Sequence, residues 1–171
     1  MDDLCQPAPE AWQGNGELRQ NETRLKYKSK YRVLGLDYGN KRIGVALSDI
    51  NWTIASPLVI LNNHGSFKKL LEIIHSNVVG VVVIGLPIAL CGKAIGKQLE
   101  KTRKFATEFK KITEVYDAKI EVLFWDERFS SNEANKVLSE LGTVKSNRKS
   151  VDKIAASLIL QGFLNSCGRP N

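Results

Sequence analysis

The sequence lacks the features of several classes of protein. None of its 171 residues belongs to an apolar run approaching the roughly 18 residues that a membrane-spanning helix needs. The acidic start at Met1 has neither the basic and apolar segments of a secretory signal nor the basic character of an organellar transit peptide. We therefore expect a cytoplasmic protein with no membrane association.

Side chains that bind metals through nitrogen or sulfur are also scarce. The three cysteines, Cys5, Cys91 and Cys167, lie far apart and form no CxxC pair. Neither of the two histidines, His64 and His75, has a second histidine or cysteine at helical spacing. The sequence thus argues against both a disulfide framework and a zinc site.

Positive charge is what the sequence has in excess, with a formal net charge of +7. Residues 1–30 contain five acids and five bases, so the whole excess belongs to residues 31–171. A basic folded domain favours a polyanionic partner, either nucleic acid or an acidic membrane surface. Residues 1–30 are polar and without periodicity, which predicts a disordered tail before one folded domain over 31–168.

Hydrophobic patterns from residue 32 onward predict alternating strands and helices. In chain order we expect strands over 32–37, 43–48, 55–61, 78–84 and 120–125. We expect a helix of about ten residues capped by Ser66, and further helices over 93–112, over 130–141 and over 151–165. The β-branched run over 78–84 belongs at the centre of the sheet, and Pro57 belongs at an edge. This order predicts an α/β, ribonuclease H-like fold, a five-stranded mixed sheet with helices on both faces.

Acidic residues occur where such a sheet builds its sites. Asp37 ends the first strand, Asp126 and Glu127 end the last strand, and Asp152 opens the final helix. Sites in α/β sheets form beyond the carboxyl ends of the strands, so the acids converge if the final helix packs across that edge. Clustered carboxylates bind hard divalent ions, and two such ions about 4 Å apart promote phosphodiester hydrolysis. Each acid taken singly also has a plain structural explanation as a turn former, a helix-dipole partner or an ion-pair partner.

Four ordered blocks of sequence resemble the YqgF/RuvX family of Holliday-junction resolvase-like proteins. The blocks are Val33–Asp49, Val83–Pro87 with Gly92, Trp125–Ser131 and Lys149–Ala156. Together they span nearly all of the predicted domain. The segment from Ile88 to Cys91 departs from the family, which usually has polar residues before the glycine.

The resemblance implies a nuclease that uses Mg²⁺ or Mn²⁺ and acts on the 5′ end of a 16S-type ribosomal RNA precursor. It also implies that Asp37, Glu127 and Asp152 are the metal ligands. Glu127 is preferred for its longer reach, with Asp126 as the alternative catalytic acid, since strand alternation directs only one of the two towards the site.

Five residues near these acids are candidates for substrate binding: Gly39, Lys41, Arg42, Arg128 and Lys149. Gly39 either leaves the turn open to a phosphate or serves only as a turn residue. Arg128 either clamps a phosphate or fixes Glu127. The lysines at 93, 97, 101 and 104 share one face of their helix, which is either solvated or lies along a nucleic-acid backbone.

Three functions remain open at this point. The leading hypothesis is an endonuclease acting on structured RNA, with ribosomal precursor particles as partners and a monomeric or weakly dimeric protein. A resolvase of branched DNA would use the same chemistry, and dimerisation would favour it because a four-way junction needs two symmetric cuts. The third is a nucleic-acid-binding factor without catalysis. The tail extends beyond the compact bacterial relatives and keeps an organelle such as the chloroplast open as a location.

Overall fold

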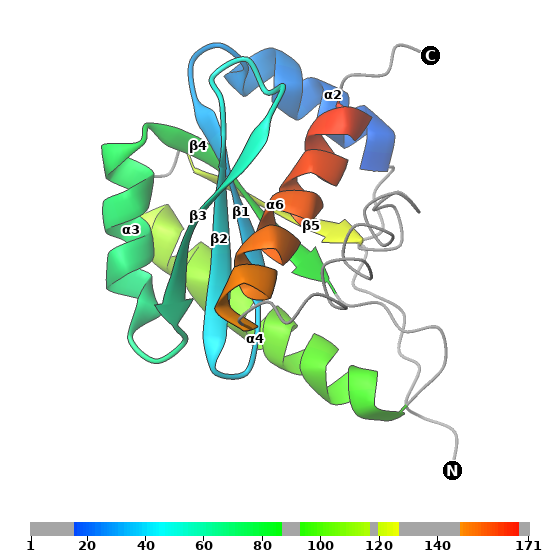
Figure 1. Cartoon of the computed structure of the whole chain (residues 1–171). Coiled ribbons are helices and arrows are strands. Elements are labelled where there is room, and N and C mark those ends of the chain that lie inside the picture. Colours follow the sequence, from blue (N-terminus) through cyan, green and yellow to red (C-terminus); the bar gives the residue numbers. More distant parts are fainter. Residues whose placement is uncertain (1–15, 87–92, 117–119, 127–147, 168–171) are drawn as a thin grey trace.

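The computed structural model describes residues 16–86, 93–116, 120–126 and 148–167. The elements in chain order are α2 (Gly16–Tyr27), β1 (Arg32–Tyr38), β2 (Arg42–Ser48), β3 (Ala55–Asn62), α3 (Ser66–Ser76), β4 (Val79–Leu86), α4 (Lys93–Tyr116), β5 (Glu121–Asp126) and α6 (Arg148–Ser166) (Figure 1). The helix predicted over 130–141 lies outside the described residues.

One mixed sheet organises the molecule, with strand order β3-β2-β1-β4-β5. β1 pairs antiparallel with β2, and β2 pairs antiparallel with β3. β1 pairs parallel with β4, and β4 pairs parallel with β5. All eight residues of β4 are buried. Pro57 lies in β3 at the sheet edge, where the register with β2 shifts beside its partner Ala46. The predicted five-stranded mixed sheet and the edge position of Pro57 are confirmed, whereas β4 is an interior strand beside β1, which is the central one.

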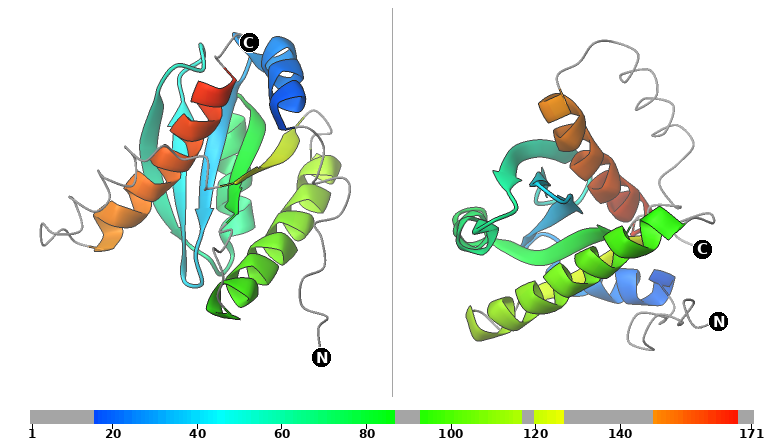
Figure 2. Two further views of the ribbon diagram at one scale, coloured as in Figure 1. Left: turned by 90° about the vertical axis from the view of Figure 1, so that its right-hand side faces the viewer. Right: turned by 90° about the horizontal axis from the view of Figure 1, so that it is seen from below.

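Helices cover both faces of this sheet, as predicted (Figures 1 and 2). α3 and α4 lie on one face and α6 lies on the other. The core beneath α3 and α4 includes Leu34, Leu36, Ile84, Phe105 and Phe109, and the core beneath α6 includes Val33, Val81, Val83, Leu160 and Phe163. The alternation of these strand residues between the two cores is the period-2 pattern of a strand buried on both faces.

Residues 16–27 form a helix, α2, within the segment for which the sequence predicts disorder. Its Tyr27 and Thr23 are buried, and Leu25 is exposed. The hydroxyl of Thr23 donates to Glu121 of β5, and Arg24 donates to the carbonyl of Cys167 beyond α6. α2 therefore packs at the end of the sheet opposite the β1–β2 hairpin turn (Figure 1).

Two helices begin differently from the sequence prediction. α3 starts at Ser66, as expected, but Ser66 is not its cap. The N-cap is Gly65, with a φ of 73° and no side-chain cap hydrogen bond. α6 starts at Arg148, three residues before the predicted Val151. Its polar first residues carry no apolar periodicity, which is the signal that places a helix start from sequence.

Candidate active site

Asp37 lies where the central strand β1 approaches its end. It pairs with Gly44 of β2 and is followed by Tyr38, the last residue of the strand. Leu34 and Leu36 belong to the core beneath α3 and α4, so strand alternation assigns Asp37 to the face of α6. The residue is half-buried. Its position is the one predicted for the first-strand carboxylate.

Gly35 lets α6 approach this strand closely. A Cβ atom on Gly35 would lie 2.7 Å from Cβ of Leu160 and 3.2 Å from the carbonyl oxygen of Ala156. Asp37 lies two residues beyond Gly35 on the same face of β1, and Asp152 lies one helical turn before Ala156. The contact therefore fixes the part of α6 that follows Asp152 against the strand that carries Asp37.

α6 runs in the direction that brings its N-terminal end to the end of the sheet where β1 finishes (Figure 1). Asp152 is the fifth residue of α6, inside the helix rather than in its first turn. In Figure 2 this end of α6 diverges from the sheet. Lys149 belongs to α6 as well, whereas the predicted helix bounds of 130–141 and 151–165 place it between two helices. The structure thus brings Asp37 and the backbone of Asp152 to one end of the molecule.

The third acid belongs to the end of β5. Asp126 is the last residue of this strand and pairs with Leu86 of β4. Its neighbour Trp125 is buried beneath α6, with its ring edge-to-face on Phe163 at a centroid distance of 5.9 Å. Glu127 lies outside the described residues, and so does the predicted phosphate ligand Arg128.

A complete set of metal ligands is not described. Among the described residues, no group of three His, Cys, Asp or Glu side chains could hold a metal ion. Two of the four predicted acids, Asp126 and Asp152, have only their backbone described. Within the same residues, no helix combines the length and apolar character needed to cross a membrane.

The β1–β2 turn that follows Asp37 is tight. The backbone N–H of Gly39 donates to the carbonyl of Arg42 over 2.8 Å. A Cβ on Gly39 would lie 2.9 Å from that carbonyl oxygen, so the close approach of two backbone segments accounts for the glycine. Lys41 is exposed, and Arg42 is half-buried at the start of β2.

Side chains from two other elements hold this turn, and sequence patterns gave no signal for them. Gln98 of α4 donates to the carbonyl of Tyr38 over 2.9 Å, and Lys101 donates to Oδ1 of Asn40 over 2.8 Å. From the other side, Asn63 donates to the carbonyl of Gly39 over 3.0 Å. The ring of Tyr38 also stacks on Phe105 of α4 at 4.5 Å. The turn is thus fixed between α4 and the segment after β3.

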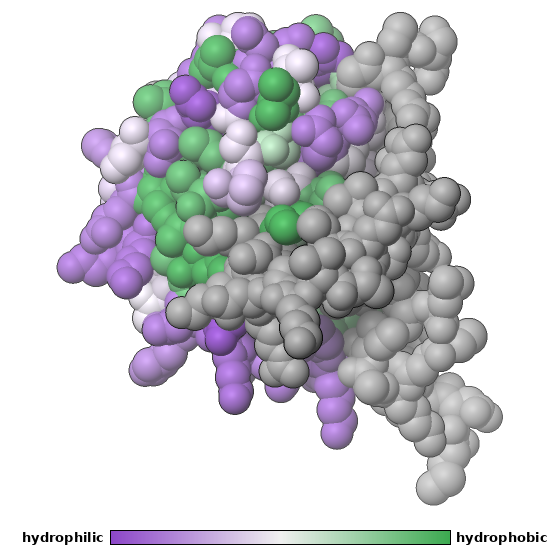
Figure 3. All heavy atoms as spheres, in the orientation of Figure 1, coloured by the Kyte–Doolittle hydropathy of each residue, from purple (hydrophilic) through white to green (hydrophobic). Residues whose placement is uncertain are grey.

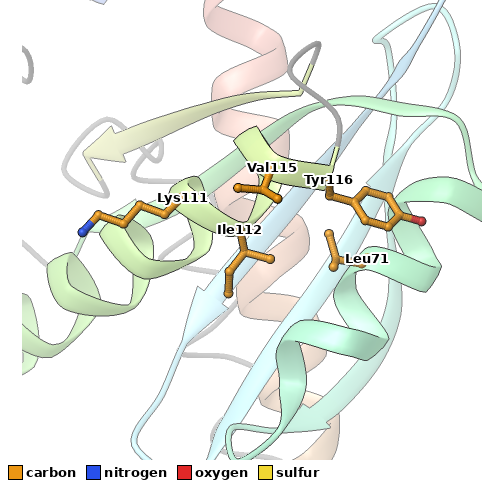
Figure 4. A pocket seen from close by; sticks show the side chains of 5 residues that line it. All are labelled: Leu71, Lys111, Ile112, Val115 and Tyr116. Atoms are coloured by element: carbon orange, nitrogen blue, oxygen red, sulfur yellow. The ribbon is translucent and has the colours of Figure 1, made fainter.

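A separate apolar groove lies between α3 and the C-terminal end of α4 (Figure 4). It has a volume of about 580 Å³ and is lined by Leu71, Lys111, Ile112, Val115 and Tyr116. Val115 is 90% exposed. None of the predicted site residues lines this groove.

Comparisons with known proteins match the chain from β1 to α6. A family model described as RuvX, Holliday junction resolvase, matches residues 31–166. A protein of Thermoanaerobacter pseudethanolicus, named "Putative pre-16S rRNA nuclease", is 39% identical over 140 residues, covering 79% of this chain and 96% of the relative. A protein of the same name from Fusobacterium nucleatum is 42% identical over 139 residues, covering 78% and 96%.

Solved structures confirm the ribonuclease H-like fold. Thermus thermophilus RuvC, in a structure titled as a complex with Holliday junction substrate, matches with a TM-score of 0.54. The match covers 80% of this chain and 96% of the RuvC chain at 13% sequence identity. At that identity the likeness concerns the fold alone.

Proposed function

The chain belongs to the RuvX family of Holliday junction resolvases, and we propose that it is a metal-dependent endonuclease that processes the 5′ end of a small-subunit ribosomal RNA precursor. The observation that carries the proposal is the placement of Asp37. The carboxylate lies near the end of a central strand, on the face across which α6 packs at Gly35. The names of the relatives support RNA as the substrate.

The proposed metal ligands are Asp37, Asp152 and Glu127, with Asp126 as the alternative to Glu127. This donor set consists of carboxylate oxygens, which Mg²⁺ and Mn²⁺ prefer over nitrogen and sulfur ligands. Asp37 is half-buried, so its charge is less screened by water than that of an exposed carboxylate. When bound, the metal would supply an activated water and neutralise charge on the phosphate.

The protein's own contribution is to hold the carboxylates in position. Gln98 and Asn63 fix the backbone immediately after Asp37 through the carbonyls of Tyr38 and Gly39. A rigid turn keeps the Asp37 carboxylate from moving when the phosphate approaches. Lys41, Arg42, Arg128 and Lys149 are the proposed phosphate contacts around it.

Branched DNA is the second candidate substrate. The description of the matching family model, Holliday junction resolvase, favours it. The reaction would be the same hydrolysis, so the substrate and not the chemistry separates the two functions.

The test is cleavage of an end-labelled rRNA precursor leader and of a four-way DNA junction, each with Mg²⁺ or Mn²⁺. Asp37→Asn removes one ligand charge and nearly preserves the shape. Its cleavage rate should fall by about a hundredfold or more, since a metal ion stabilises charge by several kcal/mol. Glu72→Gln, an equal loss of charge at an exposed position of α3, is the matched control and should cut like the wild type.

Each substrate decides one question. Cutting of the leader alone supports RNA processing, and cutting of the junction alone supports resolution of branched DNA. Equal rates for Asp37→Asn and the wild type would refute the carboxylate mechanism. If the wild type cuts neither substrate and Asp37→Asn binds them more tightly, the chain is a binding factor without catalysis.

A further inference from the structure

The positive charge of α4 is confined to one half of the helix. Residues 93–104 hold five basic residues and one acid, a net charge of +4. Residues 105–116 hold two basic residues and two acids, a net charge of zero, and include the ion pair of Lys110 with Glu114 at 3.9 Å. The charged half is the one that contacts the β1–β2 turn through Gln98 and Lys101.

Helix stability does not explain this distribution. The N-terminal end of a helix carries a partial positive charge and favours acids, and the C-terminal end favours bases. α4 has no acid in its first turn and no base in its last turn. Only Lys93 lies in the first turn, where the dipole acts, so helix stability does not account for Lys97, Lys101 and Lys104 and their function is to be sought on the surface.

Three of these lysines, Lys97, Lys101 and Lys104, recur at intervals of four and three residues and therefore share one face of the helix. All three are exposed. The opposite face is fixed in the core by the buried Thr102 and Ala106, so the orientation of α4 is determined.

This face adjoins the turn that follows Asp37. The ammonium of Lys101 lies 2.8 Å from Oδ1 of Asn40, and Asn40 is the neighbour of the exposed Lys41. We call Lys41, Lys97, Lys101 and Lys104 the basic rim. In Figure 3 the lower edge of the molecule, at the hairpin and α4, is hydrophilic. Among the described residues, no carboxylate lies within 4.0 Å of a basic-rim ammonium.

We propose that the basic rim binds the phosphodiester backbone of the nucleic acid beside the cleavage site and guides the strand towards Asp37. The inference rests on the proposed function and names a surface of its substrate site. Lysine suits the task because a mobile point charge contacts phosphates without reading bases. Binding there releases counterions, so it must weaken as the salt concentration rises.

The test compares two double variants of the full chain. Lys97→Gln with Lys104→Gln removes two basic-rim charges and leaves the Lys101–Asn40 contact in place. Lys110→Gln with Lys111→Gln removes the same charge from exposed positions in the other half of α4. Affinity for the rRNA precursor leader is measured at several salt concentrations in the Asp37→Asn background with Mg²⁺, and cleavage kinetics are measured with Asp37 restored.

The first double variant should raise Kd about tenfold or more near 0.1 M salt and reduce the slope of log Kd against log salt by about 1.5, as two lost phosphate contacts require. KM should rise with kcat unchanged. The melting temperature should stay near the wild-type value, because both lysines are exposed and surface substitutions usually change stability little. The control pair should keep the wild-type Kd and slope.

Two results would overturn the inference while leaving the proposed function intact. One is a Lys97→Gln, Lys104→Gln variant that binds and cuts like the wild type. The other is an equal loss in the Lys110→Gln, Lys111→Gln control, which would show an effect of net charge and not of this surface. If the wild type neither binds nor cuts the leader or the junction, the proposed function fails and the inference fails with it.

Discussion

Replacing Gly35 by alanine tests whether α6 is held in place by its close approach to β1. The new Cβ would lie 2.7 Å from Cβ of Leu160 and 3.2 Å from the carbonyl oxygen of Ala156. Carbon atoms pack at about 3.5–4.0 Å, so the gap is short by about 1 Å. Leu160 is fully buried and cannot turn away into solvent. Relief requires a shift of α6, and overpacking of this kind costs about 1–3 kcal/mol.

The same shift should reduce catalysis, because α6 carries Asp152 and β1 carries Asp37. A displacement of about 1 Å in a catalytic group lowers rates by about a hundredfold. The free energy of unfolding is measured by urea denaturation followed by tryptophan fluorescence, and the rate by single-turnover cleavage at saturating metal.

Gly96→Ala is the matched control. Gly96 is an exposed residue of α4, and an added Cβ would meet no atom within 4 Å. Alanine should therefore stabilise the protein by up to about 1 kcal/mol, because glycine is the poorer helix former. A Gly35→Ala variant as stable as the wild type would refute the packing argument. A destabilised variant with an unchanged cleavage rate would show that the position of α6 does not govern the site.

Two further predictions concern single side chains away from the site. The Asp49 carboxylate accepts backbone N–H bonds from Asn51, Thr53 and Ile54, so Asp49→Ala should lower the free energy of unfolding by about 1–3 kcal/mol. Burial raises the pKa of Asp49, but these hydrogen bonds outweigh the effect of burial and the pKa lies below its usual value. The stabilisation by the carboxylate is therefore present above about pH 4 and is lost as the pH falls through the folded-state pKa. The difference in melting temperature between variant and wild type should accordingly shrink in acid. Burial raises the pKa of the Cys167 thiol to about 11. In a variant with the other two cysteines replaced by serine, this thiol should resist alkylation at pH 8 until urea unfolds the protein, and rapid labelling of the folded chain would contradict its burial.

Local sequence patterns were sufficient for the sheet but not for α2. The strands carry apolar runs or alternation, which a short window detects. In α2 the described part buries only Thr23 and Tyr27. Its anchoring bonds reach Glu121 and Cys167, which are 98 and 143 residues away in the sequence. Because so few of its residues are buried, α2 has no apolar periodicity in its sequence. Its segment therefore resembles a polar tail.

The candidate site likewise contains residues that the sequence predicts and residues that it does not. Asp37 is predictable because a strand, a carboxylate and a glycine turn follow one another in the sequence. Gln98 and Asn63 are not predictable, because each donates to a backbone carbonyl of the turn that is remote in sequence. Every residue has such a carbonyl, so the sequence does not mark the acceptor. The preference for Glu127 over Asp126 depends on the direction of the chain after β5, which strand alternation alone does not determine.

The proposed reaction requires positive charge at two places, and the metal and the lysines of the basic rim would supply it separately. A carboxylate site repels a polyanionic strand, so cations must offset the repulsion both at the scissile phosphate and along the approaching backbone. The metal would act at the scissile phosphate, and the lysines of the basic rim would act along the approaching backbone. α6 repeats the pattern of α4, since its first turn holds Arg148 and Lys149 and no acid. Both helices thus begin with bases against their dipoles. Added salt screens the lysines while saturating metal keeps the site loaded, so salt should weaken substrate capture and spare the chemical step.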